Sequence, residues 1–239
     1  MRAIDDKTHT NSIAALDENS AKGFVWFELD FQWTVDGELV CGHDWGPTLQ
    51  RNDSLVLEQP PTSAESAALF AGHPHAPCTI PALARWLAEH RQARLVTDLK
   101  ERPMDGLAVL AEQIPDHARR LIAQVYQPEQ SAQALALGYR DIIWTLYRYP
   151  GTTLDVIRQL ASIQPMAVTM DEQRLVGGLR LVLQRAGVPV YVHTINDPEQ
   201  ARRYAMRWGV SGLYTDTLAP LKAETMGDAP EPMSESVLH

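Results

Sequence analysis

The sequence of 239 residues has no long hydrophobic run, although hydrophobic residues make up 45% of it. No stretch approaches the ~18 apolar residues that a membrane-spanning helix needs, so we expect no transmembrane segment. The opening MRAIDDKTHT carries no apolar segment after Arg2, which argues against a secretory signal. We therefore expect a cytoplasmic protein for the chain as written, and export only if the true start lies upstream.

Basic residues and cysteines are also scarce. The 21 Lys and Arg residues face 30 Asp and Glu, and the resulting net charge of −9 disfavours a nucleic-acid partner. Cys41 and Cys78 are the two cysteines, and they lack the CxxC spacing of a zinc site. Two cysteines do not indicate a disulfide framework either, so we expect them to be packing residues. The composition leaves the oligomeric state open.

Short β-branched runs alternate with helical patterns along most of the chain. Strands are predicted near residues 24–33, 39–43, 94–100, 120–126, 141–147, 166–170, 189–195 and 212–216. Helices are predicted at 12–22, 80–90, 106–114, 131–138, 153–163, 172–187 and 198–209. This α/β alternation predicts a parallel sheet and a TIM-type (β/α)8 barrel. We expect one barrel domain over residues 1–221 and a disordered tail over 222–239.

Residues 48–77 depart from this alternation. The segment is rich in Pro, Ser and Ala, and it is too long for an ordinary connection between a strand and a helix. Such a segment predicts a functional loop or a small lid. We expect His73 and His75, which lie within it, to be solvated.

The stretch FVWFELDFQW contains two carboxylates where a strand normally carries apolar residues. Side chains alternate between the two faces of a strand, so Glu28 and Asp30 share one face while Phe27, Leu29 and Phe31 share the other. The apolar face fits against helices, and the second face points into the barrel. Two adjacent inward carboxylates repel each other and need a cation or a shared proton. A hard divalent metal would supply that cation.

Further polar groups are predicted at the carboxyl ends of other strands, where barrels of this class carry their active sites. The same alternation in RLVTDLK places Asp98 and Lys100 on the inward face. Gln124, Tyr147 and Thr194 lie at or near the ends of three later strands. An alternative for Asp98 is a buried ionic network with Lys100 that has only a structural role.

His43 follows a turn signal at Asp36 and Gly37, which brings the short strand 39–43 back beside the carboxylates. Because imidazole titrates near neutral pH, His43 is a candidate general acid or base.

The string NSIAALDENSAKGFVWFELDFQWTVDGELVCGHDW resembles the N-terminal signature of the glycerophosphodiester phosphodiesterase family, within the phospholipase C-like phosphodiesterase superfamily. That signature runs Asn-Ser/Thr, a helix, Glu-x-Asp, Thr-x-Asp-Gly and His-Asp, and residues 11–12, 28–30, 34–37 and 43–44 match it. The later segments TIPALARWLAEH, VTDLK and YVHTINDPEQARRYAMRWGVSGLYTD are similar to the same family. The resemblance spans nearly all of residues 7–218.

The resemblance implies a (β/α)8 barrel that hydrolyses a phosphodiester to a phosphomonoester and an alcohol. It implies a divalent metal, magnesium or calcium, and a glycerophosphodiester or related lipid head group as the substrate. The residues expected to act are Glu28, Asp30 and Asp98 as metal ligands, His43 and Lys100 as catalytic groups, and Gln124, Tyr147 and Thr194 as substrate-binding residues.

This sequence departs from the family at its start. The family normally opens with a strand that carries His-Arg-Gly or His-Ala-Gly-Gly, whose histidine is its second catalytic imidazole, and this chain begins just after that place. We therefore expect a barrel that lacks its first strand and has open sheet edges. Two other functions stay open: a non-catalytic metal- or phosphate-binding barrel, and a different metal-assisted barrel reaction such as sugar isomerisation.

Overall fold

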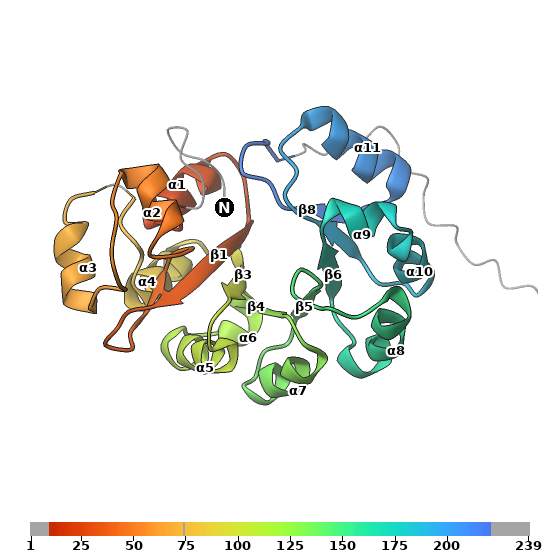
Figure 1. Cartoon of the computed structure of the whole chain (residues 1–239), viewed down its shortest axis with the longest axis horizontal. Helices are drawn as coiled ribbons and strands as arrows, with labels where there is room; N and C mark the ends of the chain where they lie inside the picture. The colour runs from red at the N-terminus through yellow and green to blue at the C-terminus, as the bar shows by residue number, and fades with distance from the viewer. Residues whose placement is uncertain (1–9, 74, 221–239) are drawn as a thin grey trace, which may run out of the picture.

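The computed structural model describes residues 10–73 and 75–220, and within them eight strands form one curled sheet (Figure 1). The strand order is β2-β1-β3-β4-β5-β6-β7-β8. The short β2 runs antiparallel to β1, and all other neighbours are parallel. The strands are β1 (Trp26–Trp33), β2 (Leu39–Cys41), β3 (Arg94–Leu99), β4 (Leu121–Val125), β5 (Ile142–Thr145), β6 (Ala167–Met170), β7 (Val190–Val192) and β8 (Gly212–Leu213). The predicted α/β barrel class is confirmed, and each predicted strand is present within its predicted range.

Helices lie around the outside of the curved sheet (Figure 1). They are α1 (Ile13–Ala21), α2 (Pro47–Asp53), α3 (Ser63–Leu69), α4 (Ile80–Glu89), α5 (Pro103–Gln113), α6 (His117–Arg120), α7 (Pro128–Ala136), α8 (Thr153–Ile163), α9 (Glu172–Val176), α10 (Leu179–Arg185) and α11 (Pro198–Trp208). Hydroxyl side chains cap several of them; Ser12, for example, accepts a hydrogen bond from the Ala15 N–H at the start of α1. The predicted helix 172–187 is divided in two, because Gly177 and Gly178 separate α9 from α10.

The two faces of the sheet differ as the side-chain alternation predicts. On the outer face of β1, Phe27, Leu29 and Phe31 join the main core, where the Phe27 ring meets Trp86 of α4 edge-on at 5.4 Å. On the opposite face, Glu28 and Asp30 line a cavity. The core therefore fixes β1 against the helices while its carboxylates face inward.

The segment 48–77 is not a simple loop. It contains α3 and all of α2 except Pro47, and its residues Leu49 and Phe70 form a small hydrophobic cluster with Val40 and Trp45. The expectation for His75 is wrong, because only 7% of its surface is exposed. The segment is therefore a packed insertion beside β2.

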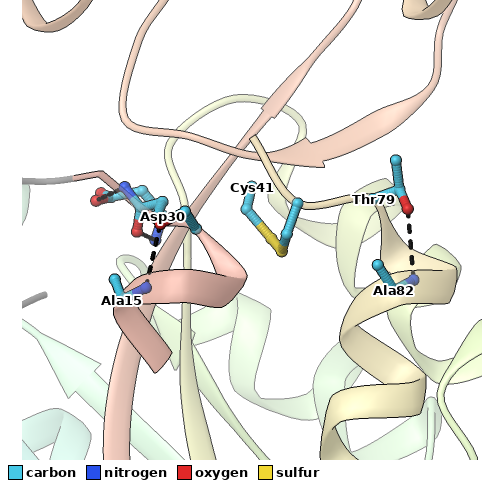
Figure 2. The surroundings of a disulfide bond; sticks show 8 residues. Ala15, Asp30, Cys41, Thr79 and Ala82 are labelled. Carbon is cyan, nitrogen blue, oxygen red and sulfur yellow. Dashed lines mark hydrogen bonds between the residues drawn. A yellow bond between two sulfur atoms is a disulfide. The ribbon is translucent and has the colours of Figure 1, made fainter. Parts of the chain in front are cut away.

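The expectation that the cysteines only pack is also wrong, because Cys41 and Cys78 form a disulfide (Figure 2). Their Cα atoms are 4.9 Å apart, within the usual range for a disulfide, and both residues are buried. A spacing of 37 residues with no local motif leaves such a pair invisible to pattern reading. Disulfides persist mainly in oxidising compartments.

The two edges of the sheet are relevant to the prediction that the first barrel strand is absent. Among the described residues, seven strands run in the parallel direction, and β8 pairs with β7 alone. Residues 1–9 and the predicted tail 222–239 lie outside the described residues, so the absent strand and the disordered tail stay predictions. Of the helices in the described ranges, none has the length and apolar character to cross a membrane.

Candidate active site

Three carboxylates meet at the carboxyl ends of β1 and β3. Glu28, Asp30 and Asp98 each offer one oxygen atom, and these atoms lie within 4.8 Å of one another. The β1–β3 register explains the meeting, because Asp30 pairs directly with Asp98 across the ladder. The alternation along β1 then places Glu28 on the same inward face.

Lys100 supplies a positive charge to this cluster. Its ammonium donates to Asp30 Oδ1 and lies 3.1 Å from Asp98 Oδ2. The Lys100 side chain is 22% exposed, so its pairing with the carboxylates is only weakly screened by water. Burial alone would lower the pKa of Lys100, but the charges of Asp30 and Asp98 raise it above its ordinary value. The ammonium is therefore held in its charged form.

The three carboxyl groups differ in their proton affinity. Burial, together with the charges of Asp30 and Asp98, raises the pKa of Glu28 to about 8. Burial and the charge of Asp30 also raise the pKa of Asp98. Burial would raise the pKa of Asp30 as well, but Lys100 and His43 outweigh it and hold that pKa below its ordinary value. The single ammonium of Lys100 therefore does not neutralise three carboxylates that lie so close together.

Two further residues hold the carboxylates in place. The Asn11 side chain donates to Asp30 Oδ2 and accepts the Asp30 backbone N–H, both at 3.0 Å. Asn11 is fully buried and adopts a left-handed backbone conformation with φ 49°, which asparagine tolerates better than most residues. The Tyr126 hydroxyl donates to Asp98 Oδ1. Both acidic side chains thus have fixed orientations.

His43 lies two residues after β2 and lines the same cavity. Its Nδ1 atom lies 2.7 Å from Asp44 Oδ2, which orients the ring. Burial would raise the pKa of Asp44, but hydrogen bonds from Thr48, His43 and Gly46 lower it far below its ordinary value. Asp44 therefore stays ionised and favours a proton on the Nδ1 atom of His43.

The cavity has a volume of about 470 Å³. Each of the eight predicted site residues lines it, from Glu28 and Asp30 of β1 to Thr194 just after β7. Gln124 is buried and accepts a hydrogen bond from the Tyr214 hydroxyl at 3.4 Å, whereas Tyr147 is 62% exposed at the rim. Thr194 is exposed on the segment after β7. The structure thus brings the predicted side chains to one cavity, and their individual roles stay predictions.

His193 is a second imidazole that lines the cavity. Its Nδ1 atom lies 3.1 Å from the Thr169 hydroxyl, and its ring meets Tyr147 and Tyr214 edge-on. Burial lowers the pKa of His193 against the opposing charges of Asp171 and Asp98, so the neutral ring is favoured.

The carboxylate cluster fits a hard divalent cation. Such ions take oxygen ligands, and three carboxylate oxygens lie close enough together to serve one ion. The raised pKa of Glu28 comes first from burial and then from the charges of Asp30 and Asp98, and a cation at the cluster would favour the ionised carboxylate against both. The site is thus chemically suited to magnesium or calcium, with no preference between them on this ground.

The sequence did not predict that Asn11 and Tyr126 hold the carboxylates, although Asn11 lies in the matched signature and Tyr126 lies at a strand end. Asn11 belongs to the entry of α1, where no strand alternation applies, and its link to Asp30 spans 19 residues. Tyr126 sits just after β4, and a tyrosine at a strand end is usually a core residue.

Comparison with known proteins supports the fold assignment. Neither a protein-family model nor a curated protein matches the sequence. Among solved structures, a glycerophosphodiester phosphodiesterase from Thermotoga maritima is similar, with a TM-score of 0.63 and 19% identity over 87% of each chain. A glycerophosphodiester phosphodiesterase from Parabacteroides distasonis gives 0.63 and 17% identity over 87% of this chain and 86% of that chain.

A third structure carries a ligand. An Oleispira antarctica phosphodiesterase in complex with the product sn-glycerol-3-phosphate is similar, with a TM-score of 0.64 and 18% identity over 86% of this chain and 87% of that chain. The fold of this chain is therefore that of the glycerophosphodiester phosphodiesterases, a barrel with its acidic cavity at the carboxyl ends of the strands.

Proposed function

We propose that this protein is a metal-dependent phosphodiesterase, and more particularly that it hydrolyses glycerophosphodiesters or related lipid head-group diesters. The observation that carries the proposal is the buried cluster of Glu28, Asp30 and Asp98 with Lys100 beside it. The phosphodiesterase fold and the product held by the Oleispira antarctica structure support the choice of substrate. Such a fold hosts several chemistries, so the residues of the site carry the argument.

The proposed roles follow from the surroundings of each group. Glu28, Asp30 and Asp98 would hold magnesium or calcium, which supplies Lewis-acid activation of a phosphoryl group. Lys100 stabilises negative charge on the phosphoryl oxygens from its place between Asp30 and Asp98. Gln124, Tyr147 and Thr194 line the same cavity, and we propose that they bind the substrate.

His43 is proposed to transfer a proton to the leaving alcohol. Asp44 engages the Nδ1 atom of the ring, so Nε2 is the atom that delivers the proton. The cavity is open to solvent at its rim, where Tyr147 is 62% exposed. The leaving alcohol therefore has a route to solvent at the rim.

Phosphorus NMR of glycerophosphocholine tests the activity directly. The protein is incubated with magnesium or calcium, and a parallel sample contains EDTA. We expect glycerol phosphate to form only when the metal is available. Metal binding without turnover would instead favour the non-catalytic barrel, and turnover unaffected by EDTA would contradict the metal-dependent reaction.

His43→Ala is expected to lower kcat roughly 10²–10⁴-fold, because it removes the proposed proton donor. Metal affinity, measured by titration calorimetry, should change little because His43 is not among the proposed ligands. His90→Ala is the matched control: His90 stacks on Trp86 at the end of α4, and its loss should leave kcat unchanged. Equal rates for wild type and His43→Ala would remove His43 from the mechanism and favour a reaction that needs no leaving-group acid.

A further inference from the structure

We propose that the Cys41–Cys78 disulfide positions His43 at the cavity, so that proton transfer depends on the oxidised bond. This inference rests on the proposed function for its kinetic readout. The disulfide ties the end of β2 to the residue that precedes Thr79, the N-cap of α4 (Figure 2). The bridge closes a loop of the chain that begins with Gly42 and His43 and contains the insertion 48–77.

The backbone next to Cys41 reaches the carboxylate cluster directly. Cys41 pairs with Phe31 in the β1–β2 ladder, and the following Gly42 N–H donates to the Asp30 carbonyl at 2.9 Å. His43 is the next residue, so its Cα position is set by this short connection. A shift of the chain at Cys41 is therefore transmitted to His43.

The disulfide is one of a few links at this point. The antiparallel strand β2 has three residues, and at its last residue the Cys41 N–H donates to the Cys78 carbonyl at 2.8 Å. Val40 forms an isolated bridge with Thr79, and the Trp45 indole donates to the Trp33 carbonyl at 2.8 Å. Without the disulfide, these links would still hold β2 beside β1, but they would constrain the end of β2 less tightly.

His43 and Asp44 lie in the turn between β2 and α2. Asp44 accepts hydrogen bonds from the Gly46 and Thr48 N–H groups, both at 2.9 Å, so local bonds hold the turn after His43 up to the start of the insertion. Its small hydrophobic cluster is separate from the main core. Loss of the disulfide would therefore displace the imidazole together with its partner Asp44.

The test compares the oxidised wild type with Cys78→Ala, because Cys78 lies far along the chain from His43. A displacement of about 1 Å costs up to a hundredfold in rate, so we expect kcat to fall roughly tenfold to a hundredfold. Affinity for magnesium or calcium and KM should change less than about threefold, because the carboxylates are also held by the β1–β3 register and by Asn11, Lys100 and Tyr126. Leu110→Ala, at a buried position of α5, is the control for lost stability; it should lower Tm and leave kcat unchanged.

A double-mutant cycle separates positioning from a general structural effect. If the disulfide acts through His43, Cys78→Ala should have no further effect on kcat in the His43→Ala background. Independent multiplication of the two losses, or an unchanged kcat in Cys78→Ala, would overturn the proposal. Should Cys78→Ala fail to fold, a dithiol applied to the folded wild type gives the same comparison. It donates two electrons to the Sγ–Sγ bond, leaving two cysteine thiols and the oxidised dithiol.

An NMR arm keeps this test independent of the proposed activity. If the oxidised wild type hydrolyses no phosphodiester, the proposed function fails, and the imidazole resonances still report on positioning. We expect the His43 ring resonance to shift or broaden in Cys78→Ala, while that of His117, before β4, stays in place. A His43 resonance that is identical in the two proteins would refute the positioning role.

Discussion

Asp30→Asn is expected to abolish metal-dependent hydrolysis while leaving the protein folded. The substitution keeps the shape of the side chain but removes the charge that lies closest to Lys100. A loss of about 4 kcal/mol of transition-state stabilisation corresponds to roughly a thousandfold in kcat/KM. Metal affinity should fall in parallel, because one of three charged ligands is gone. Titration calorimetry and phosphorus NMR measure the two effects.

The fold should survive this change for a specific reason. Lys100 retains Asp98 at 3.1 Å, so the substitution does not isolate a buried ammonium. Asp116→Asn is the matched control: Asp116 is exposed before β4, and asparagine suits its left-handed backbone at φ 59°. Its turnover should equal that of the wild type. Full activity in Asp30→Asn would instead show that the cluster is the structural ionic network considered for Asp98 and Lys100.

The site was predictable from sequence where a strict local period applies. Alternation with period two placed Glu28 and Asp30 on one face of β1 and Asp98 on the same side of β3. The parallel pairing of β1 with β3 then brings these carboxylates together, with Asp30 directly opposite Asp98. Boundaries were less accurate, and β7 is only three residues long where a longer strand was predicted.

Features set by distant contacts were not predictable in this way. The disulfide joins residues 37 positions apart, and the contact from Asn11 to Asp30 depends on a left-handed residue at the start of α1. The insertion was read as a loop because α2 and α3 have seven residues each, too few to show a clear helical period. Their packing on Trp45 and Phe70 stabilises them more than their own sequence does.

Glu28→Gln is expected to stabilise the metal-free protein at alkaline pH although it removes a proposed metal ligand. The pKa of Glu28 is about 8 in the folded protein, against 4.5 for an ordinary glutamate. Between pH 4.5 and pH 8 Glu28 keeps its proton in the folded state and has lost it in the unfolded state. Its contribution to the free energy of unfolding is therefore fully present below pH 4.5 and is lost as the pH rises through 8. Glutamine stays neutral at every pH and escapes this penalty.

In EDTA, the Tm of the wild type should therefore decrease from about pH 5 to about pH 8.5 more steeply than that of Glu28→Gln. At the alkaline end the variant should be more stable by on the order of 3 kcal/mol. Added magnesium or calcium should reverse the order, because a cation that binds the folded state stabilises the wild type more strongly. Glu112→Gln, an exposed position on α5, should follow the wild type throughout. If the Tm of Glu28→Gln and that of the wild type changed equally with pH, the pKa of Glu28 would not be raised in the folded protein. The electrostatic argument for a cation at this cluster would then fail.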